Sequence, residues 1–176
     1  TLYAINGVTP TAGQRVTAGD EVTFRLTYTV PFSRIKDYKI TDYLPLPVFA
    51  AQNLTFAGGP SATAPAAGQW SFGPDETFSQ SPINGPSPTN PTYPLTVTAD
   101  SAANSITWNF GTFADSADSS AKTDILFTVV ASNRPFGDGL LLTNQAQQSE
   151  KNTIDELITS NTAIAQVTMS EPELAI

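Results

Sequence analysis

The chain has 176 residues and a net charge of −8, from 8 Lys and Arg against 16 Asp and Glu, and it contains neither cysteine nor histidine. The missing cysteines exclude disulfides and thiolate metal sites, and the missing histidines remove the usual general base and the commonest zinc ligand. All basic residues lie outside Ile40–Ala121, so we expect no nucleic-acid partner, which would need clustered Lys and Arg. No apolar run approaches the ~18 residues of a spanning helix, so we expect no membrane span.

A chain of this size buries roughly 70% of the surface that its unfolded state exposes, and it can fold without disulfides. We expect one domain over residues 1–170, with an insertion at 57–94 and a short tail at 171–176. Leu2–Val8 predicts a short strand, and a turn-rich piece follows it as far as Asp20. The chain has no basic and apolar leader before Thr1, so an export signal is expected to be removed or to lie upstream.

The most regular stretch is residues 22–30, which are apolar at every second position. Side chains alternate across a strand, so the apolar groups share one face and Thr and Arg share the other; the apolar members are Val22, Phe24, Leu26, Tyr28 and Val30. Pro31 lacks an amide hydrogen and ends the strand. This pattern is typical of one sheet in a two-sheet sandwich, with a core face and a polar back.

A second strand follows through Tyr38, Ile40 and Asp42, and the prolines of Leu44–Pro47 end it. Val48–Phe56 predicts a further strand with an irregular start. No helical period with caps occurs up to this point.

The insertion differs in composition, since 8 of the 14 prolines fall between Pro60 and Pro94. Long connections without structure of their own are uncommon in compact domains, so we interpret it as an ordered flap pinned by its aromatic residues. Two interpretations remain open for these side chains: they cover the sheet edge, or they form an exposed binding surface for a glycan or another surface. The residues are Trp70, Phe72, Phe78 and Tyr93.

Alternation resumes after the insertion and continues nearly to the end. The apolar positions are Leu95, Val97, Ile106, Trp108, Phe110, Ile125, Phe127, Val129, Leu140, Leu142, Ala163, Ala165, Val167 and Met169. A succession of such strands, separated by loops rich in Gly, Asp, Asn and Ser, predicts an all-β immunoglobulin-like two-sheet sandwich. Asn152–Ser160 has helix-like spacing and predicts one helical turn or a loop. Leu174-Ala175-Ile176 echoes Tyr3-Ala4-Ile5, which favours a tandem array of modules or an exchanged terminal strand; chance similarity is the alternative.

Four short motifs occur in an order that resembles a known family. They are Gly19-Asp20 before the Thr-rich strand, Ile40-Thr41-Asp42-Tyr43-Leu44-Pro45, Ile106-Thr107-Trp108-Asn109-Phe110-Gly111 and Leu142-Thr143-Asn144-Gln145-Ala146. From about Leu2 to Met169 the chain resembles the bacterial surface-repeat domain called domain of unknown function eleven, and the related isopeptide-forming domains of fimbrial proteins. The resemblance implies an immunoglobulin-like sandwich, tandem repetition and a location outside the cell, and it does not imply an enzyme.

Some of these relatives join a Lys amine to an Asn side chain in a buried site, where an acid relays the proton. The resemblance puts the acid at Asp42, the acceptor at Asn144 and the Lys near Asn6, on a strand that has no Lys. Lys39 is nearest in sequence, but alternation puts it on the face opposite Asp42. We therefore expect no isopeptide bond, and an intact mass one ammonia lighter than the sequence mass would contradict this. The alternative is that Asp42 and Asn144 cap loop amides at the sandwich end.

Acidic residues suggest two other kinds of site. Calcium is bound by clustered oxygens, and three acids lie close together in sequence, although the specific calcium-loop order is missing; they are Asp115, Asp118 and Asp124. Solvated acidic loops are the alternative. The carboxylate pairs that glycoside hydrolysis would need, Asp75–Glu76 or Asp115–Asp118, lie in loops without a supporting motif, so we expect no enzyme and no catalytic residue.

Three functions remain open at this point. The first is a spacer or stalk module of a secreted or cell-surface bacterial protein. The second is a binding module that presents the aromatic insertion to a glycan or surface. The third is a filament subunit whose terminal strand pairs with an open sheet edge of the next copy. Neighbouring copies of the module, or of the same protein, are the expected partners in the first and third cases.

Overall fold

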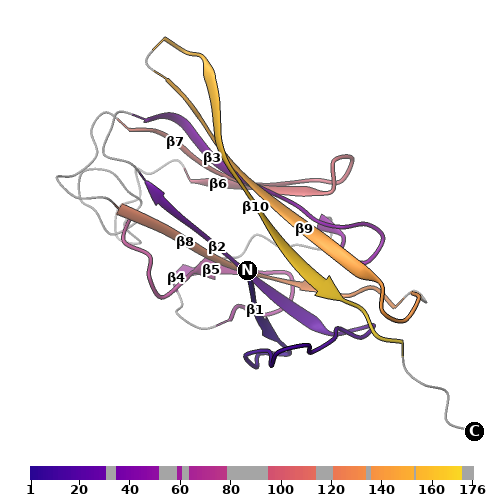
Figure 1. The fold of residues 1–176 in the computed structure, drawn as a ribbon. Helices are drawn as coiled ribbons and strands as arrows, with labels where there is room; N and C mark the ends of the chain where they lie inside the picture. Colours follow the sequence, from indigo (N-terminus) through magenta and orange to yellow (C-terminus); the bar gives the residue numbers. More distant parts are fainter. Residues whose placement is uncertain are drawn as a thin grey trace, which may run out of the picture.

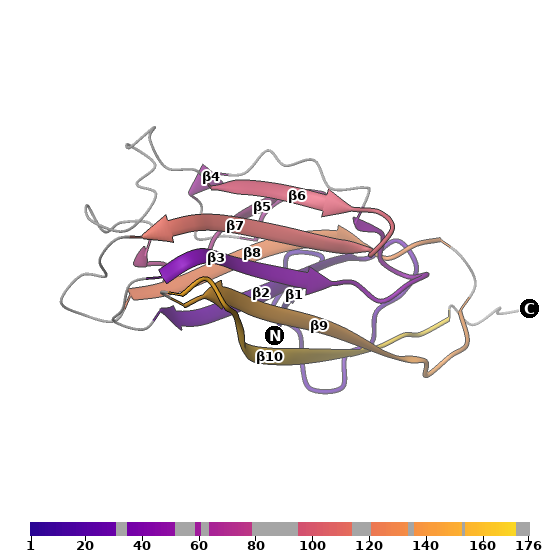
Figure 2. The same ribbon diagram turned by 90° about the horizontal axis from the view of Figure 1, so that it is seen from above.

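The computed structural model describes residues 1–30, 35–51, 59–60, 64–78, 95–113, 121–133, 136–152 and 154–171. These residues form two five-stranded sheets that face each other (Figures 1 and 2). In spatial order, the first sheet contains β1 (Leu2–Ile5), β2 (Glu21–Val30), β8 (Ala121–Val130), β5 (Trp70–Phe72) and β4 (Gly59–Pro60). The second contains β10 (Leu157–Thr168), β9 (Leu141–Lys151), β3 (Ile35–Tyr43), β7 (Ser105–Phe113) and β6 (Thr96–Asp100).

All pairings except the short β4–β5 pair are antiparallel, as expected for a sandwich of this kind. The described part of the chain contains no helix long and apolar enough to cross a bilayer. The immunoglobulin-like β-sandwich predicted from the alternating sequence is confirmed.

The first sheet is built on the pairing of β2 with β8, which runs without interruption from Glu21↔Val130 to Val30↔Ala121. This register places Phe24 opposite Phe127, with ring centroids 5.5 Å apart. The edge of Phe24 also meets Phe49 at 5.8 Å. The predicted apolar row of β2 does form the core face, with Val22, Phe24, Leu26 and Val30 buried and Tyr28 half-buried.

The second sheet contributes its own aromatic layer to the same core. Ile40 of β3 lies opposite Trp108 of β7, and both are buried. Tyr38 stacks on Phe110 at 4.9 Å, and its hydroxyl donates to Thr123 Oγ1 of the opposite sheet at 3.0 Å. The two sheets are therefore joined by one core and by a buried hydrogen bond across it.

The chain after β3 begins as predicted. Leu44–Pro47 ends β3, and Val48–Ala51 form a largely buried turn, which agrees with the irregular start expected for this segment; residues 52–56 lie outside the described residues. Asn104 explains the turn: its Nδ2 donates to the carbonyls of Leu44 and Phe49, and its Oδ1 accepts from the Ala51 amide. The side-chain amide of Asn104 thus supplies the backbone hydrogen bonds that a neighbouring strand would supply in a sheet.

The described part of the insertion belongs to the first sheet. Trp70–Phe72 form β5 and pair with β8, and Phe78 is buried beside Tyr38 and Phe110. The expectation that the aromatics pin the insertion to the body is confirmed for Trp70, Phe72 and Phe78. Tyr93 lies outside the described residues.

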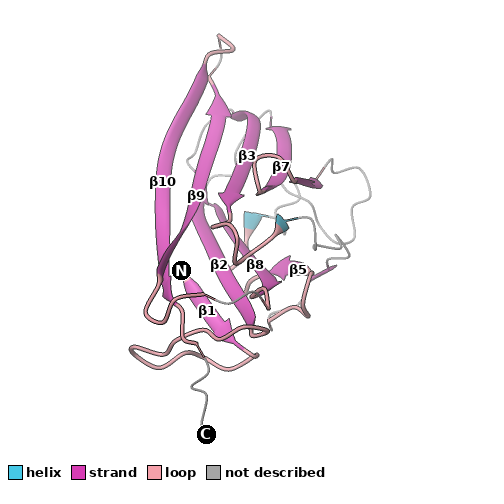
Figure 3. Cartoon of the chain, turned by 90° about the vertical axis from the view of Figure 1, so that its right-hand side faces the viewer, coloured by secondary structure: helices cyan, strands magenta, loops and turns pink. Residues whose placement is uncertain are grey.

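The β9–β10 hairpin is the longest pair and extends past the ends of the neighbouring strands (Figures 1 and 3). Its tip exposes Ile154 and Leu157. The stretch Asn152–Ser160 forms the turn of this hairpin and the start of β10, so the helical turn is wrong and the loop alternative is closer. The tail residues 172–176 lie outside the described residues.

Candidate functional site

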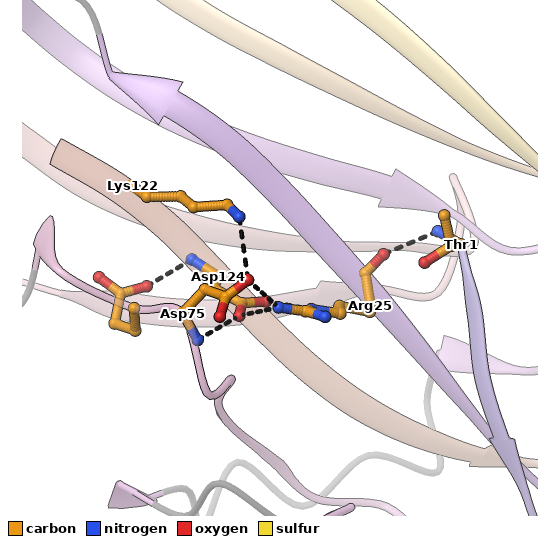
Figure 4. Close-up of polar contacts among 6 residues, drawn as sticks. Thr1, Arg25, Asp75, Lys122 and Asp124 are labelled. Carbon is orange, nitrogen blue, oxygen red and sulfur yellow. Dashed lines mark hydrogen bonds and ion pairs between the residues drawn. The ribbon is translucent and has the colours of Figure 1, made fainter. Parts of the chain in front are cut away.

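Two polar sites interrupt the apolar structure, and the first joins the insertion to the outer face of the first sheet. Arg25 of β2 donates from Nε and Nη2 to the two carboxylate oxygens of Asp124 on β8, at 2.8 and 2.6 Å. The same Nη2 donates to Asp75 Oδ2 at 2.8 Å, and Lys122 Nζ reaches that oxygen at 3.0 Å (Figure 4). We call Arg25, Asp75, Glu76, Lys122 and Asp124 the arginine clip.

Asp124 is the buried centre of the arginine clip, since its side chain has no exposed surface. Gly73 packs directly on it, because a Cβ at this position would stand 2.4 Å from the Asp124 carboxylate. The amide of Asp75 donates to Asp124 Oδ2 at 2.9 Å, and the Asp124 amide donates to Glu76 Oε2. These contacts hold residues 73–77 against the sheet.

The charges of the arginine clip stabilise one another. The hydrogen bond with Asp124 raises the pKa of Arg25 above its usual range, despite the opposing effect of burial. Hydrogen bonds from Lys122 and Arg25 lower the pKa of the Asp75 carboxyl. These ion pairs hold Asp75 of the insertion against β2 and β8.

The second polar site lies inside the sandwich, where β3 and β9 lie side by side. Asp42 and Asn144 are both buried, and Asn144 Nδ2 donates to Asp42 Oδ2 at 3.0 Å. The other oxygen of each side chain, Asp42 Oδ1 and Asn144 Oδ1, has no hydrogen-bond partner. Burial raises the pKa of Asp42 to about 7, although the Asn144 hydrogen bond and the Thr1 ammonium oppose the shift.

A cavity of about 160 Å³ opens beside this pair, between the edge of β2 and strands β9 and β10. Its apolar wall includes Leu26, Ile40, Ala146, Ala163 and Ala165. Its polar lining is supplied by Thr1, Arg25, Thr27, Tyr28, Asp42, Asn144, Gln147 and Gln148. The result is a mostly apolar cavity whose lining includes a buried acid and a buried amide.

The structure brings together some of the predicted residues and separates others. Asp42 and Asn144 are neighbours, as the family resemblance implies, and the alternative that they cap loop amides is wrong because both lie within strands and bind each other. Asn6 lies elsewhere, where its side chain donates to Asp20 and accepts from the Glu21 amide. The absence of an isopeptide bond stays a prediction.

Some of the residues predicted to bind a ligand or calcium are described by the structure, and others lie outside the described residues. Phe78 is only 1% exposed, so its assignment to a ligand surface is wrong. Trp70 and Phe72 are half-buried and meet edge to face at 5.3 Å. Arg25 and the Asp75 amide occupy both carboxylate oxygens of Asp124, which makes it unsuited to bind calcium. Asp115 and Asp118 lie outside the described residues, and the described residues contain no group of three acids arranged for a metal ion.

Sequence reasoning missed the arginine clip and the cavity. A signal for the arginine clip was available, because Arg25 interrupts the Thr row of one strand and Asp124 begins the apolar run of another, and opposite charges pair across neighbouring strands. The cavity had no such signal, since its wall combines four strands that are distant in sequence.

Comparison with known proteins gives matches in fold only. No protein-family model matches the chain, and no curated protein matches it. Similar solved structures include the C-terminal domain of the AgI/II polypeptide BspA of Streptococcus agalactiae, with 17% identity and a TM-score of 0.43. Another is the C-terminal domain of the antigen I/II-family protein AspA of Streptococcus pyogenes, with 18% identity and a TM-score of 0.48. Each match covers 85% of this chain but only 43% and 40% of those chains, so this chain spans less than half of their length.

Proposed function

We propose that the chain is a non-catalytic structural module of a secreted or cell-surface bacterial protein, where it acts as a spacer or stalk. One observation carries this proposal: a single aromatic core joins the two sheets, and the Tyr38–Thr123 hydrogen bond crosses it. A spacer needs its two sheets to be joined by one core, because sheets that were not joined would unfold one after the other when the chain is stretched. The sequence resemblance to surface-repeat domains supports the location outside the cell.

The chemistry of the described residues favours a scaffold over an enzyme. The acids that a hydrolase would use are held by basic groups and backbone amides: Asp75 by Arg25 and Lys122, and Glu76 by the Asp124 amide. Asp42 is buried and hydrogen-bonded to Asn144. A scaffold uses such groups as internal braces, and that is the role we assign to the arginine clip.

Stretching the module tests this proposal. We would place it between well-characterised marker domains and pull it in a single-molecule force instrument. We expect one rupture that releases about 560–610 Å of chain for 170 residues, less the folded separation of the ends. Two or more ruptures of smaller length, assigned to separate sheets, would contradict a spacer made of one body.

A second candidate is a module that joins its neighbours by strand addition. The described part of β1 pairs with β2 only as far as Phe24, and the Thr1 ammonium donates to the Arg25 carbonyl at 2.8 Å. Residues 26–30 of β2 therefore have a described partner on the β8 side only. An extended segment of the same protein or of a neighbouring copy could pair along this edge.

Truncation distinguishes the two candidates. Removing residues 171–176 should abolish assembly if the tail is the exchanged strand. The spacer proposal expects the truncated and full chains to have the same mass by light scattering at every concentration. Unchanged assembly of the truncated chain would exclude the tail as the exchanged strand.

A further inference from the structure

We propose that the outer face of the second sheet is a contact surface for a second copy of this chain, so that two modules pack side by side through these faces. This inference goes beyond the spacer function and would hold for either candidate above.

The register of the five strands defines this face. Trp108 and Ile40 lie opposite each other and are buried in the core, so their neighbours in the sequence point to the other side of the sheet. The outward positions are every second residue, beginning with the first, of residues 96–100, 105–109, 39–43, 143–149 and 162–166. We call these side chains the polar face; Figure 2 shows the strands that carry it lying side by side.

The first argument is charge. The chain has a net charge of −8, so two copies repel each other over most of their surfaces. Lys39 and Asp100 are the only charged residues of the polar face, and their charges cancel. Its other members are Thr, Ser, Asn and Gln, together with Tyr43 and Ile164. A second copy can therefore approach this face without repulsion, and the cores of protein interfaces are depleted of charge in the same way.

The second argument is the even height of its centre. One row of outward side chains crosses all five strands, and it consists of Thr98, Thr107, Thr41, Gln147 and Thr162. The hydroxyls of Thr41 and Thr107 share a hydrogen bond of 3.0 Å, which fixes the middle of this row. Because four of the five side chains are short, a second sheet can approach to the spacing of about 10 Å at which sheets pack face to face.

The third argument is a pair of exposed apolar side chains beside that row. Tyr43 and Ile164 lie on either side of Gln145 in the register of β3, β9 and β10. Tyr43 is 38% exposed and Ile164 is 62% exposed. Apolar and aromatic side chains of this kind become the buried anchors of protein interfaces. In a contact with twofold symmetry, each copy supplies the same pair.

The size of the polar face sets the strength of the contact. Five strands about 4.8 Å apart give a width of about 24 Å, and five to seven residues per strand give a depth of about 20 Å. The footprint of about 480 Å² per copy lies at or below the small end of specific interfaces, which bury about 600 Å² per partner. We therefore expect a weak, reversible dimer of the single module.

Sedimentation velocity of the whole chain, from about 10 μM to about 1 mM in about 0.15 M salt, tests the contact. The mean sedimentation coefficient should rise with concentration from that of a monomer towards that of a dimer, with a dissociation constant within this range. A monomer at every concentration would overturn the proposal, and so would growth beyond the dimer without a limit.

Thr41→Lys tests whether the polar face is the surface in contact. Thr41 lies on the middle strand and in the middle row, so a twofold axis through the face passes close to it and brings two added charges together. The dimer should dissociate at least about tenfold more readily. Thr29→Lys is the matched control, because Thr29 is exposed on the outer side of β2 in the other sheet. Equal dimerisation of the two variants, both shown to be folded by their urea midpoints, would contradict the contact.

Ile164→Ser provides a second test that does not disturb the core, because this side chain is largely exposed. It removes one apolar anchor from each copy and should weaken the dimer about tenfold. Removing residues 171–176 should leave the dimer unchanged, since the tail is not part of the polar face. Loss of the dimer on this truncation would assign the association to the tail, and an unchanged dimer in Ile164→Ser would exclude the anchor; either result would overturn the proposal.

Discussion

At the scale of single residues, the buried polar groups differ sharply in how well they are matched. Asp124 has a guanidinium, a backbone amide and a close glycine around it. Asp42 has one neutral amide and an oxygen without a partner. Removing the charge of Asp42 should therefore stabilise the protein, whereas removing the guanidinium partner of Asp124 should destabilise it.

Asp42→Asn should make the protein more stable at neutral and alkaline pH. The pKa of Asp42 in the folded state, about 7, lies above the ordinary value of 3.8 for this carboxyl, so the folded state holds the proton more tightly than the unfolded state. Protonation of Asp42 in the folded state stabilises the wild type. This stabilisation is fully present below the pKa that Asp42 has in the unfolded state, and it is lost as the pH rises towards 7. The free energy of unfolding of the variant should exceed that of the wild type by on the order of 3–4 kcal/mol at pH 8, with little difference at pH 4. Urea titrations at these pH values measure it, and a difference independent of pH would contradict the burial of an ionisable Asp42.

Arg25→Met should destabilise the protein strongly. It leaves the fully buried Asp124 carboxylate without its countercharge, which costs about 3–5 kcal/mol in comparable buried pairs. Lys122→Met is the matched control, because Lys122 is partly exposed and reaches only the exposed Asp75. Its urea midpoint should stay close to that of the wild type. Similar effects of the two substitutions would contradict a buried, Arg25-dependent arginine clip.

Residue identities were predictable where a pattern or a resemblance marked them. The juxtaposition of Asp42 and Asn144 followed from motif order, yet their missing partners depend on the spacing of four strands, which no local pattern encodes. Asp124 looked like one of three calcium ligands, because sequence proximity does not reveal that its oxygens face Arg25 on a strand about 100 positions away.

At the scale of elements, the strands were predictable and their connections were not. β2, β3, β7 and β9 follow from period-two alternation, because each has one face in the core. β8 is buried at every position from 123 to 129, and its core members are Ile125, Phe127 and Val129. β5 did not follow from alternation, since three residues are too short to show a period, and its place depends on pairing with β8. Val48–Ala51 look like a strand because they are apolar, but Asn104 satisfies their backbone as a turn.

The insertion should contribute to stability mainly through Phe78. Phe78→Ala removes a buried ring that meets Tyr38 and Phe110 edge to face, so we expect a loss of about 3–5 kcal/mol in the free energy of unfolding. Phe72→Ala removes a half-buried ring at the sheet surface and should cost clearly less. Urea denaturation followed by circular dichroism compares them. Equal and small losses would mean that Phe78 does not belong to the core.

At the scale of the whole molecule, the two sheets share one core, and this is the feature on which the spacer function depends. β2 and β8 supply Phe24 and Phe127, β3 and β7 supply Tyr38 and Trp108, and Trp108 meets Phe127 at 5.3 Å across the interface between the sheets. Removing either sheet would expose the apolar face of the other. We therefore expect the strands of both sheets to unfold together.

Native-state hydrogen exchange tests this claim most directly. The amides of β2 and β8 in one sheet and of β3 and β7 in the other should share one opening free energy and one denaturant dependence, equal to those of global unfolding. Exchange of one sheet through a separate opening of lower free energy, while the other stays protected, would contradict a module that acts as a single body.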